Sequence, residues 1–519
     1  MRRSPEQPVP WWITVPVLAV LGSVGSVAAQ QATGAIELRV LTAAAGEPVD
    51  GAEVRVGEIG SLTSETGTAR LEVPAGEHTV RVRKIGFAEA AARVTVSVDR
   101  TTAVLMRLEI AAAEVEGIVV TTTRTERRVE DEPVRVEVLG REEIEEKLLM
   151  TPGDIAMMLN ETSGLRVQST SPSLGGANVR IQGLRGRYTQ ILSDGLPLYG
   201  GQTGSLSMLQ IPPMDLGQVE VIKGAASALY GSTALGGVVN LISRRPADGE
   251  REVLVNRSTL GGTDGVAWIS DRIGERWGYT FLGGAHYQSQ ADVDSDGWVD
   301  LAGYRRLVGR PRIFWDDGAG RSLFVTVGGT VEAREGGTRE GTTTPAGSFH
   351  PEALDTRRGD IGMLGRFLLA GEKLLTVRGS GMRQRHEHLF GDTDERDRHA
   401  NGFAELTYAG TAGPHSWLLG VAIQHETYSA EDVAGFDFTH TAPALFVQDE
   451  YAPIDWLTIA ASARLDRHSE YGVFGNPRLS ILLRPGGRWS VRASAGTGYY
   501  APTPFTEETE AVGLRRLLP

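Results

Sequence analysis

Three aspartates at alternate positions, with a fourth nearby, are the first place in this sequence where side chains could gather around an ion. These are Asp292, Asp294 and Asp296, the last of which is followed at once by a glycine, and Asp300 lies four residues further on. Carboxylates spaced in this way before a sharp turn can wrap a hard cation such as Ca²⁺. The closing glutamate of an EF-hand is absent, because Gly303 stands in its place. We expect a surface loop that either binds a structural calcium ion or stays solvated without one, and the sequence suggests no other cofactor.

The residues that enzymes use for covalent chemistry are missing or wrongly spaced. The chain has no cysteine. It also lacks a G-x-S-x-G nucleophile motif and the glycine motifs of P-loop and dinucleotide-binding folds. His386, Glu387 and His388 are contiguous rather than in the H-E-x-x-H spacing of a zinc peptidase, so we expect them to line a strand or a loop tip. The sequence predicts that the protein is not an enzyme and has no catalytic residue.

The first thirty residues have the pattern of an export signal. Arg2 and Arg3 precede an apolar run, and the small residues Ala28 and Ala29 follow it. We therefore expect a cleaved signal peptide over residues 1–29. No later apolar run reaches the ~18 residues that a spanning helix needs, so any membrane insertion must use a β-barrel. The formal net charge of −13 argues against a nucleic-acid partner.

Residues 34–108 alternate apolar and polar side chains in short runs separated by turn residues. Ile36, Leu38 and Val40 form one such run, which is typical of a small β-sandwich. The segments 46–54, 74–78 and 85–87, with Thr63 and Gly67 between them, resemble the carboxypeptidase regulatory-like domain. That resemblance implies a non-catalytic module. Another immunoglobulin-like sandwich is the alternative.

A linker over residues 109–123 joins this module to a glycine-rich segment over residues 124–246. The linker contains a β-prone stretch, which consists of Glu116, Gly117, Ile118, Val119, Val120, Thr121 and Thr122. A strand with a free edge can be gripped by a partner's sheet. The glycine-rich segment carries a Thr-Pro helix start at 151–152 and further motifs at 164–167, 178–183, 188–198 and 219–243.

These motifs closely resemble the plug domain of TonB-dependent outer-membrane receptors. The resemblance implies that residues 124–246 fill a barrel and that residues 116–122 are the TonB box, so TonB is the implied partner. It also implies that Arg180, Glu220 and Lys223 pair with charges on the barrel wall. In the family, the ligand meets plug loops that face outward. The matching positions here give five candidates for ligand contact: Gln168, Ser171, Ser173, Tyr199 and Gln202. The alternative is that they are ordinary polar loop residues.

The ligand class follows only from finer features of the same resemblance. Lys223-Gly224 and Gly236-Gly237 look like the siderophore and cobalamin branch, whereas the regulatory-like module often accompanies carbohydrate receptors. We expect import of a ferric siderophore. Cobalamin, haem or another metal chelate, and oligosaccharide or peptide, are the alternatives. A surface binding protein that does not transport is the alternative of a different class.

Residues 250–519 have the alternation of a transmembrane β-barrel. Leu457, Ile459 and Leu465 alternate with polar or small residues over a run of about ten. Receptors of this family have a 22-stranded barrel. About 270 residues supply only ten to fourteen strands of that type. We therefore expect roughly half a barrel, a chain that is a fragment, and contact with outer-membrane lipid. Aromatic residues near strand ends, including Tyr499 and Tyr500, are expected in the girdles at the membrane surfaces.

Overall fold

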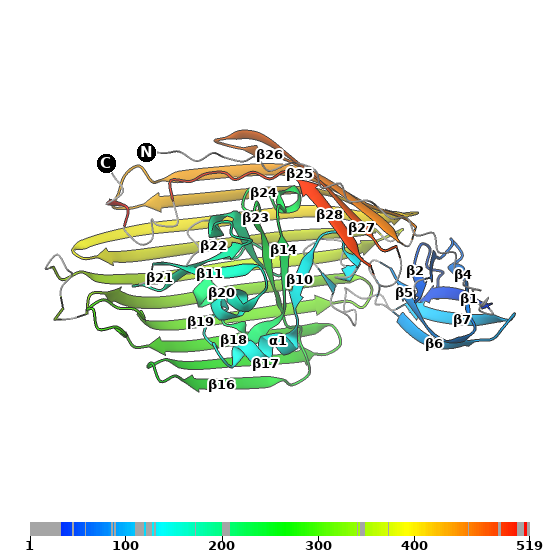
Figure 1. The fold of residues 1–519 in the computed structure, drawn as a ribbon, viewed down its shortest axis with the longest axis horizontal. Helices are drawn as coiled ribbons and strands as arrows, with labels where there is room; N and C mark the ends of the chain where they lie inside the picture. The colour runs from blue at the N-terminus through cyan, green and yellow to red at the C-terminus, as the bar shows by residue number, and fades with distance from the viewer. Residues whose placement is uncertain are drawn as a thin grey trace, which may run out of the picture.

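The computed structural model describes residues 33–515, with gaps at 44–45, 58, 85–86, 88–89, 109–118, 121–126, 129–130, 172, 200–207, 340, 343–347, 372, 455, 486–488 and 506–512. The expected signal peptide, residues 1–29, lies outside the described residues. Figure 1 shows three parts: a small β module at one end, a broad sheet of long strands, and a mixed segment that lies against this sheet.

The N-terminal module is a sandwich of two sheets. One sheet has the order β4-β1-β7 and the other the order β3-β2-β5-β6. Ile36, Leu38 and Val40 on β1 are fully buried in the core between the sheets, as the alternating pattern predicted. The strands are β1 (Thr33–Thr42), β2 (Glu53–Val56), β3 (Ile59–Leu62), β4 (Thr68–Pro74), β5 (Gly76–Arg83), β6 (Ala90–Val96) and β7 (Thr101–Leu108).

The plug, which is described from residue 131 to residue 243, combines a four-stranded sheet of order β10-β14-β15-β13 with a β11-β12 hairpin and short helices. Ile155, Leu159 and Val221 are fully buried in its core. Its elements are β10 (Val136–Leu139), α1 (Arg141–Leu148), α2 (Ala156–Glu161), β11 (Leu165–Ser171), β12 (Gly176–Ile181), η2 (Gly186–Tyr188), β13 (Thr189–Ser193), η3 (Met208–Gln210), η4 (Pro213–Asp215), β14 (Leu216–Lys223), α3 (Ser227–Tyr230) and β15 (Gly237–Ser243).

The third part is a 13-stranded antiparallel sheet, here called the wall, in which each strand pairs with the next one along the chain. The strand count lies within the expected range of ten to fourteen. The strands are β16 (Arg251–Arg257), β17 (Thr263–Ile273), β18 (Trp277–Gln288), β19 (Gly303–Asp316), β20 (Arg321–Gly337), β21 (Pro351–Leu369), β22 (Lys373–Phe390), β23 (Thr393–Ala412), β24 (His415–Ala430), β25 (Phe438–Ile454), β26 (Leu457–His468), β27 (Gly472–Leu483) and β28 (Val491–Gly496).

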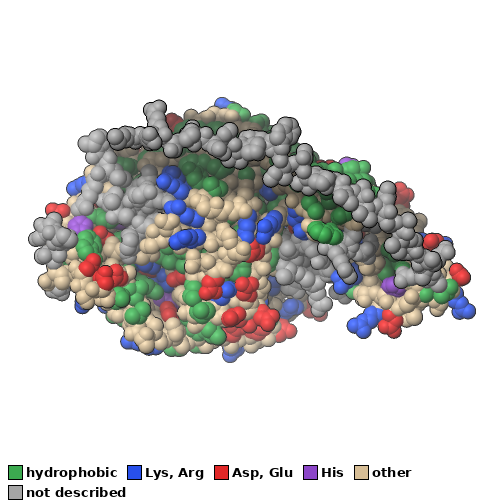
Figure 2. Space-filling model, in the orientation of Figure 1, with side chains coloured by type: hydrophobic (Ala, Val, Ile, Leu, Met, Phe, Trp, Pro, Cys, Tyr) green, Lys and Arg blue, Asp and Glu red, His purple; other side chains and the backbone are tan. Residues whose placement is uncertain are grey.

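The two faces of the wall differ in character, as a barrel requires. On β20, Glu332 and Arg334 are buried on the face that meets the plug, whereas Val327 and Val331, earlier on the same strand, are exposed on the other face. Polar side chains therefore face inward and apolar ones outward. Figure 2 shows charged and apolar side chains interspersed over the face in view. Within the described ranges, no helix has the length and apolar content needed to cross a membrane.

The two ends of the wall differ in the length of their connections. Three connections at one end are short turns, 274–276, 317–320 and 413–414. The other end carries the two longest connections, 289–302 and 338–350, beside the short turns 391–392 and 469–471. The N-terminal module sits at the first of these ends (Figure 1), where Lys84 Nζ donates to Thr411 Oγ1 at 3.2 Å.

The prediction for two of the girdle aromatics was wrong. Tyr499 is buried and stacks on Phe474 at 4.2 Å, and Tyr500 makes an edge contact with Tyr188 of the plug at 4.9 Å. Strand β28 ends at Gly496, and the chain then turns onto the inner face rather than continuing along the wall.

Candidate functional site at the contact between plug and wall

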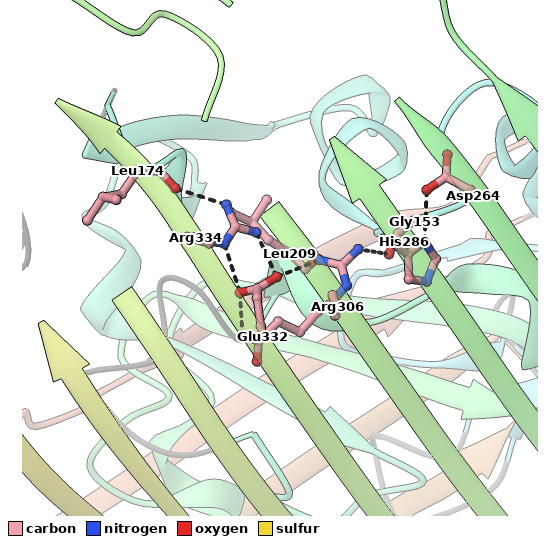
Figure 3. Close-up of polar contacts among 9 residues, drawn as sticks. Gly153, Leu174, Leu209, Asp264, His286, Arg306, Glu332 and Arg334 are labelled. Atoms are coloured by element: carbon pink, nitrogen blue, oxygen red, sulfur yellow. Dashed lines mark hydrogen bonds and ion pairs between the residues drawn. The ribbon is translucent and has the colours of Figure 1, made fainter. Parts of the chain in front are cut away.

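Arg306 on β19 ties the wall to two separate loops of the plug. Its Nη2 donates to the carbonyl oxygen of Gly153 at 2.9 Å, and its Nη1 donates to the carbonyl oxygen of Leu209 (Figure 3). The side chain is fully buried. Because a guanidinium presents several donors in a rigid fork, one residue can hold two backbone segments at once.

Glu332 on β20 neutralises two buried arginines. Its Oε2 lies 3.2 Å from Arg306 Nη1, and its Oε1 accepts from Arg334 Nε at 2.8 Å (Figure 3). Gln210 of the plug also donates to Oε1 at 2.8 Å, and Arg334 Nη1 donates to the carbonyl oxygen of Leu174 at 2.9 Å. We call Arg306, Glu332 and Arg334 the plug–wall network.

Further contacts extend this interface along the neighbouring strands. Arg312 on β19 forms a buried ion pair with Asp215 of the plug at 2.5 Å. Ser173 of the plug donates a hydrogen bond from its hydroxyl to Glu352 on β21. The backbones of the plug and the wall also approach each other closely at Gly336. A Cβ added to this glycine would lie 1.9 Å from the carbonyl oxygen of Ser173.

Asp154, beside the network, is half-buried with its carboxyl close to positive charge. Burial raises the pKa of this carboxyl above its usual value, against the opposing effect of Arg306 and of the hydrogen bond from Ala156 N–H. That hydrogen bond, 2.9 Å long, satisfies a backbone donor at the start of α2. The plug thus carries an acidic group with a raised pKa next to Gly153, whose carbonyl oxygen accepts from Arg306.

The structure describes three of the five ligand-contact candidates in side-chain detail, and for all five the role stays a prediction. Gln168 is exposed on β11, and Ser173 is half-buried against the wall. The Tyr199 side chain is buried, with the guanidinium groups of Arg358 and Arg310 at 4.7 and 5.8 Å from its ring. Ser171 is placed only as the last residue of β11, and Gln202 lies outside the described residues.

Of the three plug charges, Lys223 and Glu220 have partners inside the plug rather than the predicted partners on the wall, whereas wall pairing of Arg180 stays a prediction. Lys223 forms its ion pair with Glu137 on β10, within the plug itself. Glu220 accepts hydrogen bonds from Gln218 and Asn240, which are also plug residues. The reason is local, because β14 lies inside the plug sheet and its side chains meet neighbouring plug strands before they reach the wall. Arg180 lies opposite Arg166 in the β11-β12 hairpin.

The network residues themselves were missed from the sequence. Arg306, Glu332 and Arg334 look like ordinary inward positions of alternating strands. Several of their partners in the plug are backbone carbonyls, which any residue supplies. The only available signal was that charged residues occupy inward-facing positions on two adjacent strands.

The remaining predicted sites fall partly outside the described residues. Val119 and Val120 form β8, a short strand that pairs with β9 (Arg127–Arg128), whereas 116–118 and 121–122 lie outside the described residues.

In the acidic loop, ligand atoms of Asp292, Asp294 and Asp300 lie within 4.8 Å of one another. Asp296 instead accepts from the Trp298 N–H at 2.8 Å. Calcium binding stays a prediction.

The wall can hold the plug and release it, because non-covalent polar contacts join these two parts of the chain. Hydrogen bonds to backbone carbonyls and buried ion pairs hold the plug at one defined position. Such contacts can be exchanged for water or for a ligand without breaking any covalent bond. The interface is therefore suited to a plug that is held in one position and can later be displaced.

Two family models match the chain. Residues 128–238 match the TonB-dependent Receptor Plug Domain, and residues 35–109 match the Carboxypeptidase regulatory-like domain. The iron-regulated outer membrane virulence protein of Vibrio cholerae is 22% identical over 413 residues, which cover 75% of this chain and 60% of that protein. The vitamin B12 transporter BtuB of Photobacterium profundum is 25% identical over 412 residues, which cover 74% and 62%.

Solved structures share the fold. The siderophore receptor PirA of Pseudomonas aeruginosa superposes with a TM-score of 0.57 at 20% identity, covering 71% of this chain and 62% of that one. A ferric enterobactin receptor of the same organism gives 0.59 at 17% identity, covering 74% and 64%. The chain spans about 60% of the length of the curated relatives that it matches.

Proposed function

Because this chain carries the plug domain and the wall of the TonB-dependent outer-membrane receptors, we propose that it serves energy-coupled import of a scarce nutrient. We place it in the outer membrane, as the name of one relative, an iron-regulated outer membrane virulence protein, indicates for that protein. In outer-membrane barrels the short turns face the periplasm and the longer loops face outward. We infer from this rule that the N-terminal module lies in the periplasm, because it contacts the wall near the short turn 413–414.

The observation that carries the proposal is the plug–wall network. A plug that only filled space would need apolar packing alone, yet this one is held by buried charges aimed at its backbone. Polar contacts of this kind fix one closed position and can be traded for others when the plug moves. We propose that the plug closes the path through the receptor until an energising partner displaces it, and that the protein performs no covalent chemistry.

For the ligand we propose a ferric siderophore. The late-plug residues Lys223-Gly224 and Gly236-Gly237 favour the siderophore and cobalamin branch, and an iron-regulated protein is among the relatives. Cobalamin is the second candidate, because a vitamin B12 transporter matches over a similar span. The proposed partner is TonB, which would grip residues 116–122.

The test is accumulation of radioactive iron and of labelled cobalamin in cells that express this protein in place of their own receptors. Iron accumulation that depends on an added siderophore and on an energised inner membrane supports the proposal. Accumulation of cobalamin alone would move the ligand to the second candidate. Binding without accumulation of either would contradict import and favour a surface binding protein.

A further inference from the structure

Two histidines and an aspartate gather on the inner face of the wall, at the end away from the N-terminal module. His386 and His388 are two residues apart on β22, so both side chains point to the same face. Asp397 on β23 lies directly opposite His386 in the antiparallel register. All three side chains are close to fully buried.

The spacing of the ligand atoms matches what a metal ion requires. His386 Nδ1 lies 3.3 Å from Asp397 Oδ1, and His388 Nε2 lies 3.6 Å from Asp397 Oδ2. One ligand atom from each of the three residues lies within 4.8 Å of the others. Zinc ligands at about 2.0–2.2 Å from a tetrahedral centre stand roughly 3.4 Å apart. The His–Asp separations bracket this value.

Three other histidine–carboxylate pairs on the same sheet are closer. His286 and Asp264, His399 and Glu426, and His415 and Asp449 are joined by direct contacts of 2.8 to 2.9 Å. Those distances are ordinary hydrogen bonds. In the cluster the distances are longer than a good hydrogen bond, as is the 3.6 Å between His350 and Glu352. The cluster differs from all four pairs because two imidazoles face one carboxylate.

Two polar atoms without hydrogen bonds and the neighbouring Gln384 also favour a metal site. Among the described residues, neither Asp397 Oδ1 nor His388 Nδ1 makes a hydrogen bond. The side-chain amide of Gln384 lies 2.5 Å from His386 Nε2. With the amide oxygen turned to the ring, His386 Nε2–H donates to it, and the lone pair of Nδ1 then faces Asp397. Metal-ligating histidines are oriented in this way by a second hydrogen bond.

We propose that His386, His388 and Asp397 bind a divalent transition-metal ion of the zinc class on the inner wall. Imidazole and carboxylate are ligands that such ions accept. Three protein ligands leave a fourth position open to water or to a donor atom from a passing molecule. The site does not depend on the proposed import, because it is built from the wall alone.

The test uses the untagged full chain, purified in detergent and stripped with a chelator. Titration with Co²⁺ should give the intense visible bands of a four-coordinate site with nitrogen ligands at one equivalent, and Zn²⁺ should displace it. Asp397→Asn and His386→Gln should each weaken binding by at least ~10-fold. His399→Gln is the matched control, since it removes a buried histidine from the same face of β23.

The cobalt spectrum of the unchanged chain keeps the test decisive even if a variant folds poorly. Absence of visible bands and of zinc binding in the unchanged chain would overturn the proposal. So would equal affinity in the unchanged chain, Asp397→Asn and His386→Gln, or a loss in His399→Gln as large as theirs. None of these results bears on uptake, so failure here is separate from failure of the import proposal.

Discussion

At Glu332 a single carboxylate faces two buried guanidinium groups. Removing its charge by Glu332→Gln leaves Arg306 and Arg334 without compensation in a buried place. We expect the free energy of unfolding to fall by about 3–5 kcal/mol, because an uncompensated buried charge is costly. Urea unfolding followed by protease cleavage of the plug measures this change.

Glu387→Gln is the control for that prediction. Glu387 is also a wall glutamate paired with an arginine, but its side chain and that of Arg385 are both about half exposed. Exposed pairs contribute at most ~1 kcal/mol. Equal losses in the two variants would mean that the plug–wall network does not hold the plug.

Asp131, the first described residue of the plug, makes the contact with the N-terminal module depend on pH. Burial acts to raise the pKa of this carboxyl, but Arg55, Arg484 and Arg83 outweigh it and hold the pKa below its usual value. A lowered pKa means that the ionised form stabilises the folded contact. The contribution is therefore present above about pH 4 and is lost as the pH falls further.

We accordingly expect Asp131→Asn to lower the thermal midpoint of the chain at pH 7 and to lower it by progressively less as the pH falls below about 4. The loss should amount to at most ~1 kcal/mol, because the three arginines are partly exposed and screened by solvent. Asp248→Asn, at an exposed ion pair with Arg272, is the control and should change neither midpoint. A loss of the same size at pH 3 as at pH 7 would show that charge is not the cause.

At the scale of elements, β20 brings the wall backbone directly against the plug. Gly336→Ala places a Cβ where the Ser173 carbonyl oxygen now lies, so the β11-β12 hairpin must move. We expect a loss of about 1–3 kcal/mol, as for an overpacked core, together with faster cleavage of the hairpin by protease. Gly329→Ala on the same strand meets nothing within 4 Å and should leave cleavage unchanged.

The elements were largely predictable from the sequence, and the contacts between them were not. Period two in the module and in the wall, and the motifs of the plug, predicted three parts that the structure contains. The partner of Lys223 was not predictable, because a charge on β14 finds Glu137 only once β10 has added to the plug sheet. A motif identifies a fold without saying which neighbouring strand is nearest.

The proposed metal site was not predictable from the sequence either, because it is shared by the two strands of a β-hairpin. His386 and His388 lack the spacing of a helical zinc motif, and the sequence alone gave no reason to associate them with Asp397. The register of β22 against β23 brings these residues together. Spacing rules for helices do not describe a site that is shared by two strands.

At the scale of the whole molecule, the chain runs from the N-terminal module through the plug into the wall. In sequence, the segment 116–122 stands between the module and the plug, so the proposed pull on it would reach the ion pairs of Asp131 first and then β10 and the plug sheet. The plug–wall network would then oppose that pull. Import would require the partner to overcome a set of buried polar contacts rather than a covalent link.

The most direct measurement of this account is uptake by the protein with and without residues 116–122. We expect deletion to abolish energy-dependent accumulation of the iron–siderophore complex while ligand binding at the cell surface stays within about twofold, since the wall and the described plug core are untouched. Accumulation that survives the deletion, at the rate of the unchanged protein, would contradict coupling through this segment and with it the central proposal.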